Sequence, residues 1–173
     1  MNENQIIRRC QRHDLKAYKM IYERYEQPLL HTAQRMLQQK QDAEDAVQMT
    51  FLKLYRGIKN YRFGSKFSSY LFKILMNVCF DMLKKKGKAK VVSIDDYTPS
   101  SKQEFALKIQ LENSINALPE RMRVCFLLYA VEQFKLREIA QILDISTGGV
   151  KSNIYHAKMK LRGMLNPTYV EEQ

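Results

Sequence analysis

The sequence predicts an all-α protein with two small helical domains joined by a basic, flexible linker. Apolar residues recur three and four positions apart along most of the 173 residues, which is typical of amphipathic helices. The chain has only 6 glycines and 4 prolines, so few positions interrupt these helices. The helical periodicity stops at a lysine-rich stretch near the middle of the chain and resumes after it. This break divides the helices into two groups.

The first group begins with the stretch DLKAYKMIYERY, where Asp14 is the expected N-cap. Pro28 is expected to open a second helix, because proline is favoured in a first helical turn. The third helix contains DAEDAVQMTFLKLY and is expected to end near Gly57. A long fourth helix is expected from about Phe67 to Lys84.

The third helix carries two stripes of residues. The wider stripe is apolar and predicts the face toward the core; it contains Val47, Phe51, Leu54, Tyr55 and Ile58. The second stripe lies to its side and contains Asp45, Gln48 and Leu52. An exposed acid, amide and leucine in one row indicate a surface for another protein. Carboxylates in a first turn are also favoured by the helix dipole, by about 0.3–1 kcal/mol each.

The composition changes in the stretch KKKGKAKVVSIDDYTPSSKQ, which has no sustained apolar period. We assign residues 87–103 to the linker, between a first domain at 1–86 and a second at 104–165. Residues 166–173 form a tail. The lysines are either the solvated end of the preceding helix or a basic strap on a phosphate backbone.

The second group of helices begins at about Glu104. Pro119 is expected to start the next helix, PERMRVCFLLYAVEQ, whose apolar centre predicts burial. The segment that follows, KLREIAQILDISTGGVKSNIYHAKMKLRGML, has the pattern of a helix-turn-helix. In it Ala140 supplies a small residue at the helix crossing, Asp144 can adopt the positive φ of the turn, and Ser146 can cap the second helix.

The second helix of this motif has an inward and an outward face. Val150, Ile154, Ala157 and Leu161 are expected to face inward. The outward face joins cations to hydroxyl groups, which suits the major groove of DNA. It contains Thr147, Lys151, Ser152, Tyr155, Lys158 and Arg162. The alternative is a short helical hairpin with a solvated basic face.

The charge of the chain favours an anionic partner. Lys plus Arg number 29 against 18 for Asp plus Glu, a formal net charge of +11. Such an excess points most often to nucleic acid and less often to a membrane surface. No apolar run approaches the roughly 20 residues that span a bilayer, and MNENQIIRRC lacks the apolar region of a signal peptide. We therefore expect a cytoplasmic protein without membrane insertion.

The cysteines and acids give no reason to expect a metal or a cofactor. Cys10, Cys79 and Cys125 are far apart and lack CxxC spacing, which argues against disulfides and zinc. Cys79 and Cys125 are predicted to be small core residues. Asp42 and Asp45 share a helix face, but the sequence places neither a third carboxylate nor a histidine one or two turns away.

Three segments together resemble a known family. DAEDAVQMTFLKLY is similar to region 2.2 of bacterial RNA polymerase sigma factors of the extracytoplasmic-function (ECF) group, in the sigma-70 family. FSSYLFKILMNVCFDMLKKK is similar to the segment of those factors that melts and reads the minus-ten element. LPERMRVCFLLY and the helix-turn-helix resemble region 4, which reads the minus-thirty-five element. The resemblance covers the chain from about Asp14 to Leu165.

This resemblance implies a function and its residues. Asp45, Gln48 and Leu52 would bind the clamp helices of core RNA polymerase, and the outward face of the recognition helix would bind duplex promoter DNA. The melted strand would be held by aromatic, basic and polar side chains, namely Tyr61, Arg62, Phe63, Lys66, Tyr70, Lys73 and Asn77. The resemblance also implies an anti-sigma factor as a partner. Such a protein is not an enzyme, because the polymerase supplies the chemistry.

Two other functions remain open at this point. One is a transcription regulator with a helix-turn-helix and an N-terminal dimerisation domain, which would bind promoter DNA without being a polymerase subunit. The other is a nucleic-acid-processing enzyme that uses the acidic cluster Asp42, Glu44 and Asp45, although the ligand set of a metal site is incomplete.

Overall fold

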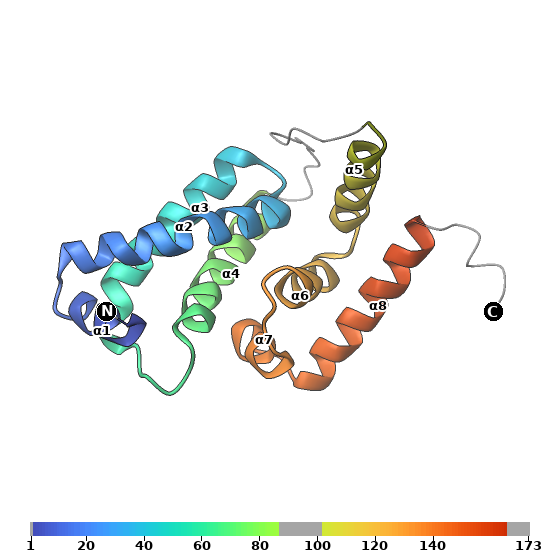
Figure 1. The fold of residues 1–173 in the computed structure, drawn as a ribbon. Coiled ribbons are helices and arrows are strands. Elements are labelled where there is room, and N and C mark those ends of the chain that lie inside the picture. Colours follow the sequence, from blue (N-terminus) through green and yellow to red (C-terminus); the bar gives the residue numbers. More distant parts are fainter. Residues whose placement is uncertain (1, 87–101, 166–173) are drawn as a thin grey trace. The chain divides into compact units, whose positions relative to one another are not determined.

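The regular structure of the described residues is entirely helical, as predicted. The computed structural model describes residues 2–86 and 102–165, which form eight α-helices and one 3-10 helix (Figure 1). These helices divide into two compact units, one holding α1 to α4 and the other most of α5 to α8. The predicted linker lies outside the described residues except for its last two, which begin α5 (Lys102–Asn116); the tail lies outside them entirely.

The first unit contains α1 (Glu3–Cys10), α2 (Leu15–Leu37), α3 (Lys40–Gly57), η1 (Ile58–Asn60) and α4 (Phe67–Lys86). Helices α2, α3 and α4 pack against one another, and α1 packs on α2. Their contacts enclose a core of fully buried aliphatic side chains that includes Ile21, Leu29, Leu54, Leu71 and Leu75. Helix α3 ends at Gly57 as predicted, and α4 begins at Phe67 and ends two residues beyond its predicted limit.

The predicted helix boundary at Pro28 is wrong, because α2 continues through this residue as one helix of 23 residues. Proline inside a helix removes a backbone hydrogen bond and costs about 3 kcal/mol. Ile21 and Leu29, on either side of Pro28, are both fully buried in the same core. Burial of such side chains contributes about 1.5–3 kcal/mol each, which offsets the cost of the proline.

Helix α1 was not expected from the polar N-terminal sequence. Its start is closed by a capping box: the Gln5 backbone N–H donates to Asn2 Oδ1 at 2.9 Å, and the Asn2 N–H donates to Gln5 Oε1 at 3.0 Å. Ile6, Ile7 and Cys10 face the core and are buried. The helix therefore forms because its short apolar face docks on α2.

The predicted core-facing stripe is confirmed for Val47 and Leu54 of α3 and for Ile58, the first residue of η1, which are all buried. Phe51 is half-buried. The prediction is wrong for Tyr55, which is 41% exposed. Successive residues are about 100° apart around a helix, so Tyr55 cannot share the orientation of Leu54. Its ring instead lies at the surface, with its centroid 5.0 Å from that of Tyr18.

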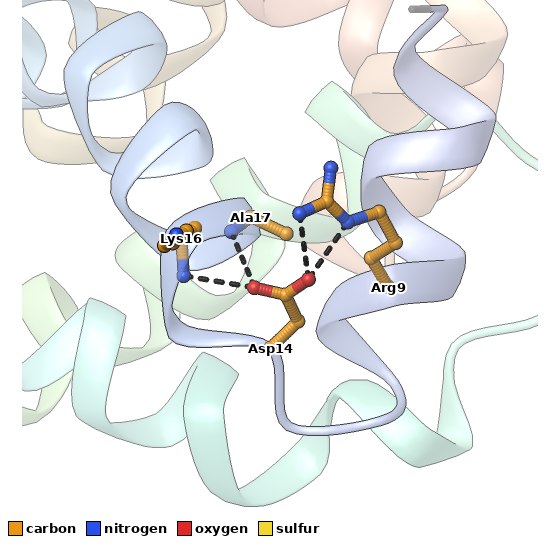
Figure 2. A network of polar contacts seen from close by, with 4 residues as sticks. All are labelled: Arg9, Asp14, Lys16 and Ala17. Carbon is orange, nitrogen blue, oxygen red and sulfur yellow. Dashed lines mark hydrogen bonds and ion pairs between the residues drawn. The ribbon is translucent and has the colours of Figure 1, made fainter.

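Asp14 caps α2 as predicted and also holds the turn that joins α1 to α2 (Figure 2). Its Oδ1 accepts the backbone N–H groups of Lys16 at 2.9 Å and Ala17 at 3.2 Å. Its Oδ2 lies 2.7 Å from Nε and 2.7 Å from Nη2 of the Arg9 guanidinium. The hydrogen bond from Arg9 and those from the α2 backbone lower the pKa of the Asp14 carboxyl.

Replacing Asp14 by asparagine should lower the melting temperature in a pH-dependent way. Asparagine keeps the capping oxygen but loses the charge that pairs with Arg9. The pKa of Asp14 is lower in the folded chain, so the carboxylate stabilises the fold above its unfolded pKa and this contribution is lost as the pH falls. The parent and Asp14→Asn should therefore differ by a constant amount near pH 6, and this difference should shrink as the pH falls from about 4, the usual pKa of an aspartate, through the lower pKa of folded Asp14. Melting curves recorded across this pH range test the prediction. A difference in melting temperature that does not change with pH would contradict a stabilising ion pair between Arg9 and Asp14.

The second unit contains α5, α6 (Glu120–Ala130), α7 (Leu136–Leu143) and α8 (Thr147–Leu165). Helix α8 packs against both α5 and α6. Helix α6 begins directly after Pro119, as predicted, and buries Val124 and Leu128.

The cysteines predicted to lie in the core are buried. Burial raises the pKa of the Cys79 thiol to about 12 and that of Cys125 to about 11. Both thiols therefore stay protonated at neutral pH and act as small apolar groups. Across residues 2–86 and 102–165, no group of three or more His, Cys, Asp or Glu side chains is placed to hold a metal ion. None of the described helices combines the length and the apolar character needed to cross a membrane.

Candidate nucleic-acid and protein interfaces

One exposed row of α3 contains all three residues of the predicted protein-binding stripe. Asp45, Gln48 and Leu52 are exposed, and Leu52 keeps 53% of its surface open to solvent. Met49, beside them on α3, is 47% exposed. An acid, an amide and two apolar side chains on one helix surface suit a partner that is basic at one point and apolar beside it.

An aromatic cluster connects the end of α3 to the start of α4. Tyr61 lies at its centre, with its ring centroid 5.3 Å from that of Phe63, 5.5 Å from Phe67 and 5.1 Å from Tyr70. Two hydroxyl groups tie the cluster to the backbone: Tyr61 donates to the Ser65 carbonyl at 2.6 Å, and Tyr70 donates to the Gly57 carbonyl at 3.2 Å. Burial raises the pKa of both hydroxyl groups, so both remain protonated donors.

The members of this cluster differ in their exposure. Tyr61 is 5% exposed and Phe67 is 2% exposed, so their rings belong to the core. Phe63 is 41% exposed, and Tyr70 is half-buried. Among the predicted strand-binding aromatic residues, Phe63 is therefore the most exposed ring, and the buried ring of Tyr61 contacts it.

Polar and basic residues neighbour this cluster along the chain. Arg62 and Lys66 are exposed on either side of Phe63 in the sequence. On α4, half-buried Lys73 and exposed Asn77 follow Tyr70 at spacings of three and four, which places the three residues on one helix face. Phe63 and Tyr70 meet through the Tyr61 ring, and Lys73 and Asn77 continue from Tyr70 along α4.

Two further residues reach this region from the N-terminal part of the chain. Gln11 donates from Nε2 to the carbonyl oxygens of Ile58 at 3.1 Å and Tyr61 at 3.0 Å. The guanidinium carbon of Arg8 lies 5.1 Å from the ring centroid of Phe63. Sequence reasoning missed both residues, because the Gln11 contacts span 47 and 50 positions and no local pattern marks them.

The turn of the helix-turn-helix has the predicted geometry. Asp144 adopts a positive φ of 52°, and its N–H donates to the Ala140 carbonyl. The Ile145 N–H donates to the same carbonyl at 3.1 Å. Ser146 caps α8, since its Oγ accepts the Gly149 N–H at 3.0 Å. The inward residues of α8 are all buried, namely Val150, Ile154, Ala157 and Leu161.

The outward face of α8 is open to solvent. Thr147 is half-buried, and the other predicted residues are exposed, namely Lys151, Ser152, Tyr155, Lys158 and Arg162. The Lys158 ammonium lies 5.0 Å from the ring centroid of Tyr129 on α6, which directs this long side chain across the helix pair. The face therefore offers cations, hydroxyl groups and one exposed aromatic ring to a ligand.

Comparison with known proteins matches both units. Residues 21–89 match the family described as Sigma-70 region 2, and residues 108–161 match Sigma-70, region 4. The ECF RNA polymerase sigma factor SigW of Bacillus subtilis is 27% identical over 92% of this chain and 94% of its own length. The ECF RNA polymerase sigma-E factor of Haemophilus influenzae is 25% identical over 96% of this chain and 97% of its own.

Solved structures share the fold. CnrH, in complex with the cytosolic domain of CnrY, superimposes with a TM-score of 0.73 at 20% identity, covering 94% of this chain and 96% of CnrH. The sigma factor RpoE of Bartonella quintana, in complex with the anti-sigma factor NepR, has a TM-score of 0.74 at 21% identity, covering 87% of this chain and 97% of RpoE. With regions 2 and 4 matched in order and relatives aligned over almost their whole length, this chain belongs to the ECF group of the sigma-70 family.

Proposed function

We propose that this chain is a transcription initiation factor that binds core RNA polymerase in the cytoplasm, directs it to promoters and helps to open the duplex. The ordered matches to region 2 and region 4 within one chain carry this proposal. In it the first domain, 1–86, binds polymerase and the melted strand, and the second, 104–165, binds duplex DNA. The chain itself supplies binding surfaces, and the polymerase supplies the chemistry.

Each surface has a separate task in this proposal. The exposed row Asp45, Gln48 and Leu52 binds the polymerase. Phe63 stacks on an unpaired base, which contributes about 1–3 kcal/mol per base, while nearby cations and polar groups hold the strand. The strand-holding set is Arg62, Lys66, Tyr70, Lys73 and Asn77, with Tyr61 supporting Phe63 from the core. The outward face of α8 contacts duplex promoter DNA.

An anti-sigma factor is a further proposed partner. The structure of RpoE was determined in complex with the anti-sigma factor NepR, and that of CnrH in complex with the cytosolic domain of CnrY. We infer that a comparable protein holds this chain away from polymerase until it is released.

Co-purification with core polymerase tests the central proposal. The purified chain should form a stable complex with core RNA polymerase, and this complex should start transcription at specific sites in a library of genomic DNA. A helix-turn-helix regulator would behave differently. If the chain forms dimers, binds promoter duplex tightly alone and ignores core polymerase, the proposal is wrong.

Lys151→Ala and Lys158→Ala should each weaken duplex binding and reduce its salt dependence. A lysine that neutralises one phosphate contributes about 0.9 to the slope of log affinity against log salt. Each variant holoenzyme should therefore show a slope that is smaller by about 0.9 on promoter duplex DNA. Lys160→Ala is the matched control, because Lys160 is exposed on α8 but two positions, about 200°, from Lys158. Slopes equal to the parent's in both variants would place these lysines away from DNA.

A further inference from the structure

The segment that carries Phe63 joins two helices and has turn hydrogen bonds of its own. The Tyr61 N–H donates to the Ile58 carbonyl at 3.1 Å, and the Gly64 N–H donates to the Arg62 carbonyl at 2.8 Å. Such bonds shape the turn locally. The position of the turn relative to the rest of the first unit depends on contacts with other elements.

Gln11 supplies such a contact from the end of α1. Its side-chain amide has two hydrogens, and Nε2 lies within hydrogen-bonding distance of the carbonyl oxygens of Ile58, at 3.1 Å, and Tyr61, at 3.0 Å. Ile58 is the first residue of the 3-10 helix η1, and Tyr61 is the residue that directly follows this helix. The Tyr61 carbonyl belongs to the peptide that leads into Arg62 and Phe63, so the bond orients the backbone just before the exposed ring.

Backbone hydrogen bonds and an ion pair hold Gln11 in place at the end of α1. It is the C-cap of α1, and its backbone N–H donates to the Ile7 carbonyl at 2.9 Å. The turn that follows is closed by the Asp14 N–H, which donates to the Arg9 carbonyl at 3.2 Å, and by the Arg9–Asp14 ion pair (Figure 2). The amide of Gln11 therefore projects from a turn that is tied at both ends.

Arg8 provides a second contact from the same helix. It lies three residues before Gln11, on the same side of α1. Its guanidinium lies 5.1 Å from the ring centroid of Phe63, which is a cation–π distance, while 41% of Phe63 stays exposed. Helix α1 thus contacts both the backbone before Phe63 and the ring itself.

We propose that Gln11 is a positioning residue for single-strand recognition: its amide holds residues 58–61 so that Phe63 is presented, already ordered, to an unpaired promoter base. This inference rests on the proposed function of the first domain. It assigns to α1, which lies outside the matched residues 21–89, a part in reading the melted strand. Arg8 assists by covering one side of the ring. Ordering the segment before it binds DNA removes an entropy cost from the binding step.

The test uses the full chain with Gln11→Met, which keeps the length and neutrality of the side chain but removes the donors. Gln27→Met, at an exposed glutamine of α2, is the matched control. Each chain is bound to core RNA polymerase and offered a pool of random single-stranded DNA oligonucleotides. The bound strands are sequenced. Affinity for core polymerase, thermal unfolding and amide hydrogen exchange of residues 58–66 are measured on the same preparations.

The expected result separates strand reading from folding. Gln11→Met should bind core polymerase as the parent does, but its affinity for the strands that the parent selects should fall about tenfold, which is the scale of ordering one backbone residue. Exchange should increase within 58–66, and Gln27→Met should match the parent.

Two outcomes would overturn the role of Gln11, and a third would overturn the proposed function of the first domain. If Gln11→Met selects the same strands with the parent's affinity, the positioning role is wrong. A proportional loss of polymerase binding and of strand binding would make Gln11 a general folding residue and would also overturn the inference. If the parent holoenzyme selects no strands at all, the proposed function of the first domain fails, independently of Gln11.

Discussion

A chain with Asp45→Lys and Leu52→Asp is expected to bind core RNA polymerase at least about thirtyfold more weakly than the parent. This factor corresponds to the 2 kcal/mol or more that defines a hot spot of an interface. The double change reverses the charge of the acid and places a carboxylate where the proposed interface is apolar. Gln48→Ala alone should have a smaller effect, because it truncates one neutral side chain without adding repulsion.

Because this row is exposed, a loss of polymerase binding can be separated from a loss of stability. Asp45 is exposed and Leu52 is 53% exposed, so the substitutions open no cavity. Exposed substitutions usually change stability by less than about 0.5 kcal/mol. The control is Glu23→Lys with Leu15→Asp, which makes the same charge changes on exposed positions of α2. Competition binding to core polymerase measures the effect, and parent-like affinity of the α3 variant would show that the row is not the polymerase surface.

Tyr61→Ala is expected to lower the free energy of unfolding of the first unit by about 3 kcal/mol, the usual cost of truncating a buried aromatic side chain. Tyr61 is 5% exposed and touches three other aromatic rings, so its removal leaves a cavity at the centre of the cluster. Tyr61→Phe keeps the ring and loses the bond from its hydroxyl to the Ser65 carbonyl, which should cost about 1 kcal/mol.

Phe63→Ala is the matched comparison, because Phe63 belongs to the same cluster but is 41% exposed. It should change stability little and weaken binding of single-stranded DNA by the stacking of one base, about 1–3 kcal/mol. Urea unfolding and strand binding are measured on all three variants. If Tyr61→Ala unfolds like the parent and loses strand binding, Tyr61 touches DNA directly and its supporting role is wrong.

The sequence by itself determined the helix-turn-helix in detail. The positive φ of Asp144, the capping by Ser146 and the inward face of α8 were all predicted and are all present. The turn and the cap depend on interactions within about one helical turn, and the inward face follows from the repeat of apolar residues three and four positions apart. The exposed row on α3 was predictable for the same reason, since residues three and four positions apart share a helix face.

Tertiary packing alone decided the remaining features. The local preference of Pro28 for a helix start is outweighed by the core that α2 reaches on both sides of it. The same apolar character in Tyr61 and Phe63 leads to a buried ring and an exposed one, because only Tyr61 lies against Phe67 and Tyr70. The bonds from Gln11 join residues about 50 positions apart. Contacts of this kind leave no periodic pattern, since their partners become neighbours only when the helices pack.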